Sequence, residues 1–325
     1  MKLFITGGAG FIGSAVAENL LQAGHSVTVY DSLVTGHQTA LPADAEFIQA
    51  DLADKSELEQ ALASQSFDAI LHFAAFIEAG ESMQNPGKYF HNNLANSLGL
   101  IEAAHQQGIR KFVFSSTAAV YQSSEEPLSE DSPIAPSNVY GQTKMMIERC
   151  LDWYRQTQGM HYSALRYFNA SGALPGRGEA HQPESHLIPL TLQVALGIRE
   201  QIQIFGNDYP TSDGTCIRDY IHIADLVSAH VLALEALSDH DQLVYNVGSG
   251  KGYSVREVID MARKVSGHPI PSEDSQRRSG DPARLVAAAE KINKELGWQA
   301  SHSSLEDIVS SAWDWHQSQS KTASK

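Results

Sequence analysis

The sequence predicts an α/β protein built on a doubly wound parallel sheet, with a smaller mixed α/β unit over one edge of that sheet. Three observations predict this class. Short apolar runs alternate with helical patterns through the first half of the chain, and a glycine-rich turn follows the first run. The second half is less regular and rich in glycine and proline. We therefore expect a first domain over 1–167 and a second over 168–318, with parts of 203–247 packing back on the first.

Length and composition exclude several classes of protein. The 325 residues carry a net charge of −15, which argues against a general nucleic-acid binder. No run approaches the ~18–20 apolar residues that a membrane span needs. Met1 and Lys2 lead directly into an apolar run, and the two cysteines do not suggest a disulfide framework. We expect a cytoplasmic protein without a metal site.

The first half predicts regular alternation of strands and helices. Strands are expected at 2–6, 26–30, 46–49, 69–73, 111–114 and 162–166, and helices at 14–23, 55–63, 89–107 and 139–157. The second half predicts a helix that begins at 186–189, a helix over 224–237, and two further helices that begin at Ser254 and Ser304. It also predicts strands at 203–206, 218–222 and 244–247. Residues 318–325 are expected to lack regular structure.

A glycine turn after the first strand predicts a dinucleotide site. Gly7, Gly10 and Gly13 permit a tight turn, close approach to a pyrophosphate and close helix packing. The N-terminus of the following helix favours the anion. Asp31 ends the next strand, where an acid bonds ribose hydroxyls and repels a 2′-phosphate, and no lysine or arginine lies between Ser32 and Ala50. These features predict a Rossmann-type domain that binds NAD rather than NADP.

Four strand ends are expected to meet at one edge of the sheet. Asp31, Asp51, Phe73 and Thr117 each lie at the carboxyl end of a predicted strand, where ligands bind in such sheets. Asp51 and the following Leu52 are placed to meet an adenine ring. Small residues after Phe73 allow a cofactor to approach.

Tyr140 and Lys144 are the candidate acid–base pair. They lie four residues apart in a predicted helix and therefore on one face of it. A nearby ammonium favours phenolate, so we expect Lys144 to lower the pKa of Tyr140 from its ordinary value near 10. Such a tyrosine exchanges protons near neutral pH.

With these motifs, the chain resembles the extended short-chain dehydrogenase/reductase family over essentially its whole length, and within it the UDP-sugar 4-epimerases. The matching segments are 6–13, 72–75, 80–82, 92–93, 114–121, 140–144, 166–169, 204–211, 218–222 and 278–281. The run from Phe205 to Thr211, followed by Asp213-Gly214-Thr215, is particularly similar to the epimerases.

The resemblance implies roles for individual residues. The catalytic set is Thr117, Tyr140 and Lys144. The residues implied to bind NAD are Gly7, Gly10, Phe11, Ile12, Gly13, Asp31, Ser32, Asp51, Leu52, Phe73, Ala74, Ala75, Asn92, Ser115, Tyr140, Lys144, Tyr167 and Phe168. Those implied to bind the UDP-sugar are Thr117, Asn169, His186, Leu187, Gln203, Phe205, Arg218, Tyr220, Arg278, Asp281 and Leu285.

The chain departs from the family pattern at several positions. Ile77 replaces a lysine that some members place near the cofactor, Gln122 replaces a usual glycine, and Ala170 replaces a frequent proline. His186 stands where asparagine is common. Leu285 occupies the position that limits room for a 2-acetamido group, which predicts a preference for UDP-glucose and UDP-galactose.

The implied reaction is NAD-dependent 4-epimerisation of a UDP-hexose, with oxidation at C4, rotation of the 4-keto sugar and hydride return. Related dehydratases carry an acid pair after the threonine and decarboxylases a glutamate, but here Ala118 and Ala119 follow Thr117. Epimerisation of a UDP-N-acetylhexosamine, a UDP-pentose or UDP-glucuronate remains open. So does a non-catalytic NAD-binding regulator. Helices 89–107 and 139–157 are expected to pair in a homodimer, as in the family.

Overall fold

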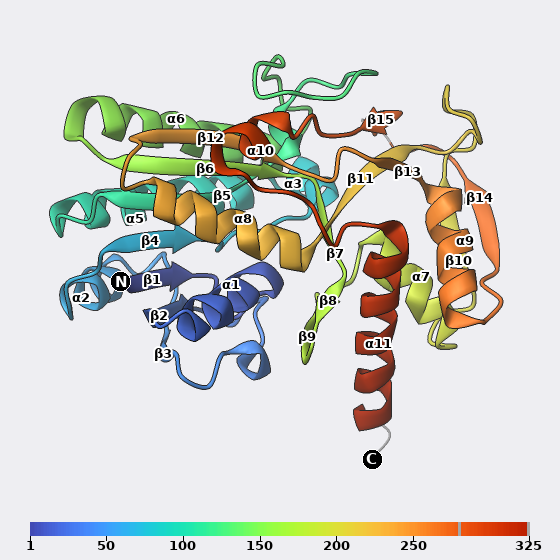
Figure 1. Ribbon diagram of the computed structural model, residues 1–325, viewed down its shortest axis with the longest axis horizontal. Coiled ribbons are helices and arrows are strands. Elements are labelled where there is room, and N and C mark those ends of the chain that lie inside the picture. The colour runs from blue at the N-terminus through green and yellow to red at the C-terminus, as the bar shows by residue number, and fades with distance from the viewer. Residues whose placement is uncertain (279–280, 324–325) are drawn as a thin grey trace.

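A seven-stranded parallel sheet forms the centre of the computed structural model, which describes residues 1–278 and 281–323 (Figure 1). Its strand order is β12-β6-β5-β4-β1-β2-β3, and every pairing is parallel. The strands are β1 Lys2–Thr6, β2 Ser26–Asp31, β3 Glu46–Gln49, β4 Ala69–His72, β5 Lys111–Thr117, β6 His161–Tyr167 and β12 Gln242–Val247. The predicted sheet is therefore confirmed, and its strand order changes direction between β1 and β4.

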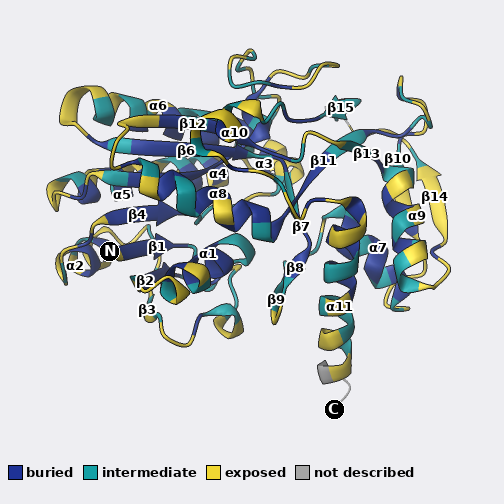
Figure 2. Cartoon of the chain, in the orientation of Figure 1, coloured by how far each residue is buried: buried dark blue, intermediate teal, exposed yellow. Residues whose placement is uncertain are grey.

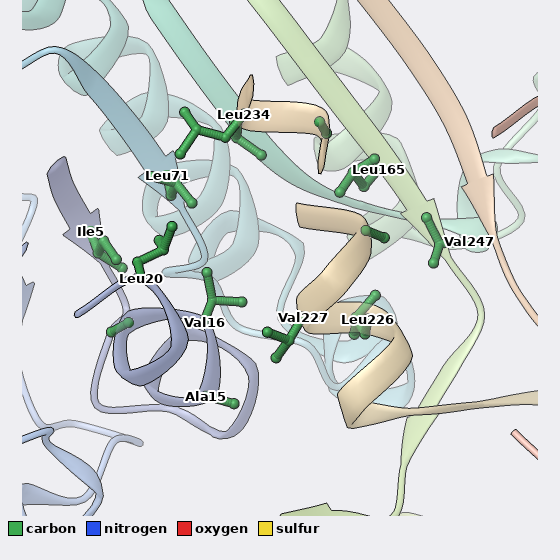
Figure 3. Packing of buried hydrophobic residues seen from close by; sticks show 14 of the residues in the cluster. Ile5, Ala15, Val16, Leu20, Leu71, Leu165, Leu226, Val227, Leu234 and Val247 are labelled. Atoms are coloured by element: carbon green, nitrogen blue, oxygen red, sulfur yellow. The ribbon is translucent and has the colours of Figure 1, made fainter. Parts of the chain in front are cut away.

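Helices cover both faces of this sheet because each presents an apolar side to it. On one face α1 (Phe11–Gln22) and α8 (Ile223–Ala236) pack together, and Leu20, Leu226 and Leu234 belong to their shared core (Figure 3). On the other face α2 (Lys55–Ala63), α5 (Asn96–Gln106) and α6 (Val139–Gln158) bury a second core. The inner strands β1, β4, β5 and β6 are mostly buried, whereas the edge strand β3 is not (Figure 2).

The helix predicted over 89–107 differs from the observed structure. The chain forms α3 (Ala79–Gln84), α4 (Pro86–Tyr89), a π-helical stretch over Phe90–Ala95 and then α5. In that stretch the Asn93 amide bonds both the N–H and the C=O of Phe76, each at 2.9 Å. The asparagine thus ties the widened turn to the segment that follows β4. Such π segments are frequent at functional sites.

The second half of the chain contributes to two layers. A mixed sheet centres on β11 (Ile217–His222), which pairs with β7 (Asn169–Ser171), β13 (Gly252–Ser254) and β15 (Arg284–Leu285). Around a third core lie α7 (Leu187–Ala195), α9 (Val255–Ser266), α11 (Leu305–Ala323) and the pair β10 (Ile202–Phe205) and β14 (Ser272–Ser275). In contrast, α8 and β12 return to the central sheet. The remaining elements are β8 Ala173–Leu174, β9 Arg177–Gly178, α10 Glu290–Leu296 and the 3₁₀ turns Gln38–Ala40 and Ala118–Val120.

Side-chain caps set the starts of the predicted helices. Ser254 and Glu257 form the expected capping box of α9, and Ser304 accepts from the N–H of Asp307 at the start of α11. The expectation of irregular structure from Ser318 onward is wrong as far as Ala323, since α11 continues to that residue, and positions 324–325 lie outside the described residues. Within the described parts of the chain, no helix is long and apolar enough to cross a membrane.

Candidate active site

The glycine turn between β1 and α1 forms a close-fitting cradle. Gly7 has φ +73°, and a Cβ added to it would lie 2.5 Å from the Ala74 nitrogen. A Cβ on Gly13 would lie 2.3 Å from the Gly7 oxygen. Both positions therefore require glycine, because backbone occupies the space of a side chain. Gly10 caps α1 without a side-chain hydrogen bond, which leaves the helix start open to an anion.

Asp31 is held rigidly at the end of β2. Its carboxylate is 9 % exposed and accepts from the N–H of Ala9 at 3.0 Å and of Leu33 at 2.8 Å. Each oxygen keeps a further lone pair for a ribose hydroxyl. Leu33 adopts φ +59°, a conformation uncommon for leucine, which lets the loop turn back on the carboxylate.

A hollow beside this turn brings together residues from four strand ends. It is open to solvent and is lined by both polar and apolar residues. Eight of the predicted NAD residues line it: Gly7, Asp31, Ser32, Asp51, Leu52, Ala74, Ala75 and Asn92. Tyr30, Val34, Thr35, Ala50 and Phe76 line it too and were not singled out, although all but Val34 and Thr35 adjoin a predicted residue. The glycine cradle, the rigid acid and the hollow fit a dinucleotide such as NAD.

Other predicted cofactor residues lie away from the lining of this hollow. Phe11, Ile12 and Phe73 pack against the core shared by α1 and α8. Phe168 is buried in a cluster with Tyr121. Their side chains therefore contribute to the packing of the core and not to the lining of the hollow.

The catalytic candidates converge where β5 ends against α6. Tyr140 is hydrogen-bonded to the side chain of Thr117, whose Oγ1 also accepts from the N–H of Ala119 at 3.1 Å. One turn along α6, the Lys144 ammonium donates to the Ser115 carbonyl at 2.7 Å. The hydroxyl of Tyr167 bonds Ser115 Oγ, so β5, β6 and α6 meet at these side chains.

Burial dominates the electrostatics of this set. It raises the pKa of Tyr140 to about 12, partly offset by the bond to Thr117 and reinforced by the charge of Glu78. Burial also lowers the pKa of Lys144 to about 7, opposed by the charge of Glu148. The lowered Tyr140 pKa that the sequence predicts is thus not found in the protein alone, because desolvation of the phenol is the largest influence on it.

Several predicted substrate residues gather around β11. Arg218 donates to the Pro282 carbonyl at 2.9 Å and lies 3.3 Å from Asp281. Its register partner on β15 is Leu285. The register also places Asn169 beside Tyr220, but the Tyr220 side chain is buried in the core around α7.

A second group lies around the end of β10. The Arg278 guanidinium stacks 4.0 Å from the centre of the Phe205 ring, and Arg277 stacks 4.1 Å from that of Tyr209. The Tyr209 hydroxyl is buried and has no hydrogen-bond partner among the described residues. Gln203, in contrast, points to solvent.

His186 and Leu187 lie at the start of α7. Burial disfavours a charge on His186, but its 2.8 Å contact with Glu184 and the nearby charge of Glu179 raise its pKa to about 9. The histidine is therefore a cation at neutral pH, where the family often has a neutral asparagine.

Comparison with known proteins identifies the family of this chain. Residues 3–248 match the NAD dependent epimerase/dehydratase family. The chain belongs to this family. It is 48% identical over 314 residues to the UDP-glucose 4-epimerase of Corynebacterium glutamicum, covering 96% of this chain and 95% of that protein.

Solved structures of related epimerases have the same fold. The Brucella ovis UDP-glucose 4-epimerase in complex with NAD superposes with a TM-score of 0.93 at 39% identity, covering 97% of this chain and 98% of that one. The Bifidobacterium longum UDP-glucose 4-epimerase in complex with NAD+ and UDP gives 0.93 at 34% identity, with coverages of 98% and 99%. These matches to the epimerase/dehydratase family confirm the predicted fold, family and NAD cofactor.

Proposed function

We propose that the protein is an NAD-dependent UDP-glucose 4-epimerase whose acid–base residue is Tyr140. The observation that carries this proposal is the position of Tyr140, bonded to Thr117 and one turn from Lys144, in a chain whose strand ends also form a hollow that fits a dinucleotide. NAD, when bound, accepts a hydride from C4 of the sugar and returns it. Because the net redox change is zero, the cofactor must stay bound between turnovers.

Each residue of the set has a distinct task. Tyr140 takes the proton of the 4-hydroxyl and gives it back to the same oxygen once the keto sugar has turned about its diphosphate link and presents its opposite face. Thr117 orients the phenol and the sugar oxygen. Lys144 supplies positive charge beneath the phenol and binds the nicotinamide ribose. A cation beside the site is needed because burial alone keeps Tyr140 protonated.

The diphosphate is assigned to the groups at β11, β10 and α7. Arg218 and Arg278 make charge-assisted bonds to it, with Asn169 and Leu187 on the same substrate. His186 adds a third positive charge. These assignments follow the resemblance, and they are supported by the shared register of Arg218 and Leu285 on paired strands.

Dehydration and decarboxylation are disfavoured by the residues after Thr117. Ala118 is 2 % exposed and Ala119 completes the 3₁₀ turn with it, and neither side chain can donate a proton. Within the 4-epimerases, N-acetylated sugars, pentoses and glucuronate remain candidate sugars. We place the boundary between the two domains at 167–168.

The experiment that tests this function is turnover without added reductant. Purified protein is mixed with UDP-galactose, and the equilibrium mixture with UDP-glucose is followed by chromatography. Interconversion is expected. Protein that holds NAD but leaves UDP-galactose unchanged would instead indicate the non-catalytic NAD-binding regulator.

We further propose a cytoplasmic homodimer built on α5 and α6. Leu98 on α5 and Trp153 on α6 are 41 % and 63 % exposed, so both helices that would pair offer an apolar side chain to a partner. Trp153→Glu should produce a monomer by light scattering, whereas Ile198→Glu, equally exposed at the end of α7, should not. Wild-type protein that is monomeric at micromolar concentration would exclude this dimer.

Cys150 and Cys216 are free thiols, which suits a reducing compartment such as the cytoplasm.

A further inference from the structure

The irregular segment that leads from β9 to α7 crosses to the cofactor side of the molecule. Residues 177–186, which we call the strap, belong by sequence to the second half of the chain. Helix α11 holds the start of the strap, since the Trp315 indole N–H donates to the Glu179 carbonyl at 3.1 Å. Gly178 lies directly against that indole, and a Cβ there would be 2.3 Å from a ring carbon. In Figure 1, β9 accordingly lies between α1 and α11.

The first bridge from the strap reaches the helix that follows the glycine turn. The Arg177 guanidinium lies 2.9 Å from the carboxylate of Glu18 on α1 and also donates to the Ala40 carbonyl. Because the arginine is largely buried and makes both contacts, it ties the strap to two segments of the cofactor-binding unit.

The second bridge lies beside Asp31. His37 Nε2 is 2.8 Å from the Ala180 carbonyl of the strap. The backbone N–H of His37 donates to the Ala9 carbonyl at 2.9 Å, within the glycine turn. The imidazole thus joins the strap to the loop that lines the hollow through Ser32 and Val34.

The third bridge lies beyond the end of β4. The Glu78 carboxylate is 3.1 Å from His181 Nε2 and accepts from Ser185 Oγ at 3.0 Å. His181 lowers the pKa of Glu78, and Glu78 raises the pKa of His181, so each residue favours the charged form of the other. Two strap residues therefore converge on a single carboxylate.

We propose that the strap retains the bound dinucleotide, with Glu78 as its principal latch. The three bridges end on α1 and Ala40, on the loop after β2 and on the segment after β4, all of which belong to the unit that forms the dinucleotide hollow. With the strap fixed at those points, release of the cofactor would require the bridges to open. The inference rests on the proposed function, since an epimerase needs its NAD to remain bound through many cycles. Glu78 and His181 act as positioning residues, holding the strap rather than reacting.

The test is the rate at which NAD leaves the purified holoprotein. Free NAD is trapped by a coupled dehydrogenase as it appears. Glu78→Gln and His181→Gln should each release NAD about fivefold to tenfold faster, because losing a charge-assisted bond acts mainly on the off-rate. The double variant should be no faster than Glu78→Gln, since both changes open the same bridge. His37→Gln opens a separate bridge and should multiply the effect of Glu78→Gln.

Matched controls are exposed residues distant from the strap, Glu125→Gln and His240→Gln, which should leave the release rate unchanged. Release from Glu78→Gln at the wild-type rate would overturn the proposal, as would equal acceleration in the controls. If Glu78→Gln fails to fold, the NAD release rate of His37→Gln is used instead, and release at the wild-type rate would overturn the proposal. Turnover of UDP-galactose is measured in parallel. If the variants release NAD at the wild-type rate and turnover is normal, the proposed role of the strap is wrong but the proposed function stands. If the strap variants release NAD faster but the wild-type protein shows no turnover, the proposed function is wrong but the role of the strap stands.

Discussion

The Lys144 ammonium lies 5.9 Å from the centre of the Tyr140 ring, one helical turn away, and its hydrogen bond to the Ser115 carbonyl fixes it there. Among the described residues, the hydrogen bond of this ammonium goes to the Ser115 carbonyl and not to the phenol. Lys144 therefore acts on Tyr140 through its charge. The charge is itself sensitive to the environment, because burial brings the lysine pKa to about 7.

Removal of the Tyr140 hydroxyl should abolish proton transfer without emptying the site. Tyr140→Phe is expected to lower kcat by about 10²–10⁴-fold, the range for loss of a general acid–base group. The NAD content of the purified variant should stay at the wild-type level. Tyr154→Phe on the same helix is the control and should keep full activity. A Tyr140→Phe enzyme with near-normal turnover would refute the assignment.

Replacement of Lys144 should change both the pH dependence of stability and the catalytic function. In cofactor-free protein its pKa is about 7, against an ordinary value of 10.5 for lysine. Between these values the unfolded chain holds a proton that the folded protein has lost, so the free energy of unfolding should rise with pH from 7 to 10.5. Lys144→Met should lose this rise while turnover and NAD affinity fall. Denaturant melts at several pH values test it, with Lys294→Met as the control, and an unchanged pH slope would contradict it.

His230 should contribute to the loss of stability in acid. It is fully buried between Phe73 and Tyr167, and burial lowers its pKa from 6.5 to about 4. As pH falls from 6.5 to 4, the unfolded chain takes up a proton that the folded protein refuses, so stability present above pH 6.5 is lost. His230→Leu should reduce the slope of the free energy of unfolding against pH, between pH 4 and 6.5, by up to about 1.4 kcal/mol per pH unit. His240→Leu, at an exposed position, should leave that slope unchanged.

The sequence predicted those features that local patterns determine. The glycine spacing, Asp31 and the Tyr140–Lys144 spacing each depend on short-range geometry, and the structure places them as expected. The π-helical stretch was missed because it depends on Asn93 reaching Phe76 across 17 positions. The sign of the Tyr140 pKa shift was missed because burial is a tertiary property. Likewise, the bond between Glu78 and His181 joins residues about 100 positions apart, and no local pattern predicts it.

Asp31 should set the preference for NAD over NADP. Its buried carboxylate faces the hollow and would repel a 2′-phosphate. Asp31→Asn keeps an acceptor oxygen and removes the charge, so the ratio of NAD to NADP affinity should fall about tenfold, roughly the ~1.4 kcal/mol expected of one lost charge contact. Titration of cofactor-free protein with both dinucleotides measures it. Wild-type protein that binds NADP as tightly as NAD would contradict the prediction.

The choice of sugar should depend on Leu285. This residue pairs in register with Arg218 on the neighbouring strand and packs against the cluster that contains Phe168. Its side chain is therefore partly buried against that cluster, on the strand next to the proposed diphosphate residue Arg218. Forcing a 2-acetamido group against such a wall costs about 1–3 kcal/mol, or roughly 5–150-fold in rate. We expect kcat/KM for UDP-galactose to exceed that for UDP-N-acetylgalactosamine by a factor in this range.

The Leu285 side chain itself can be tested by truncation. Leu285→Gly should raise kcat/KM for the acetylated sugar and change that for UDP-galactose little, so that the ratio between the two substrates narrows. Ile198→Gly, at an exposed position far from β15, should leave the ratio as it is. Melting temperatures of both variants show whether the loss of packing against Phe168 has loosened the strand, since a general loosening would lower kcat/KM for both sugars together. Equal wild-type values for the two sugars would mean that the wall yields to the acetamido group, and Leu285 would then not determine the choice of sugar.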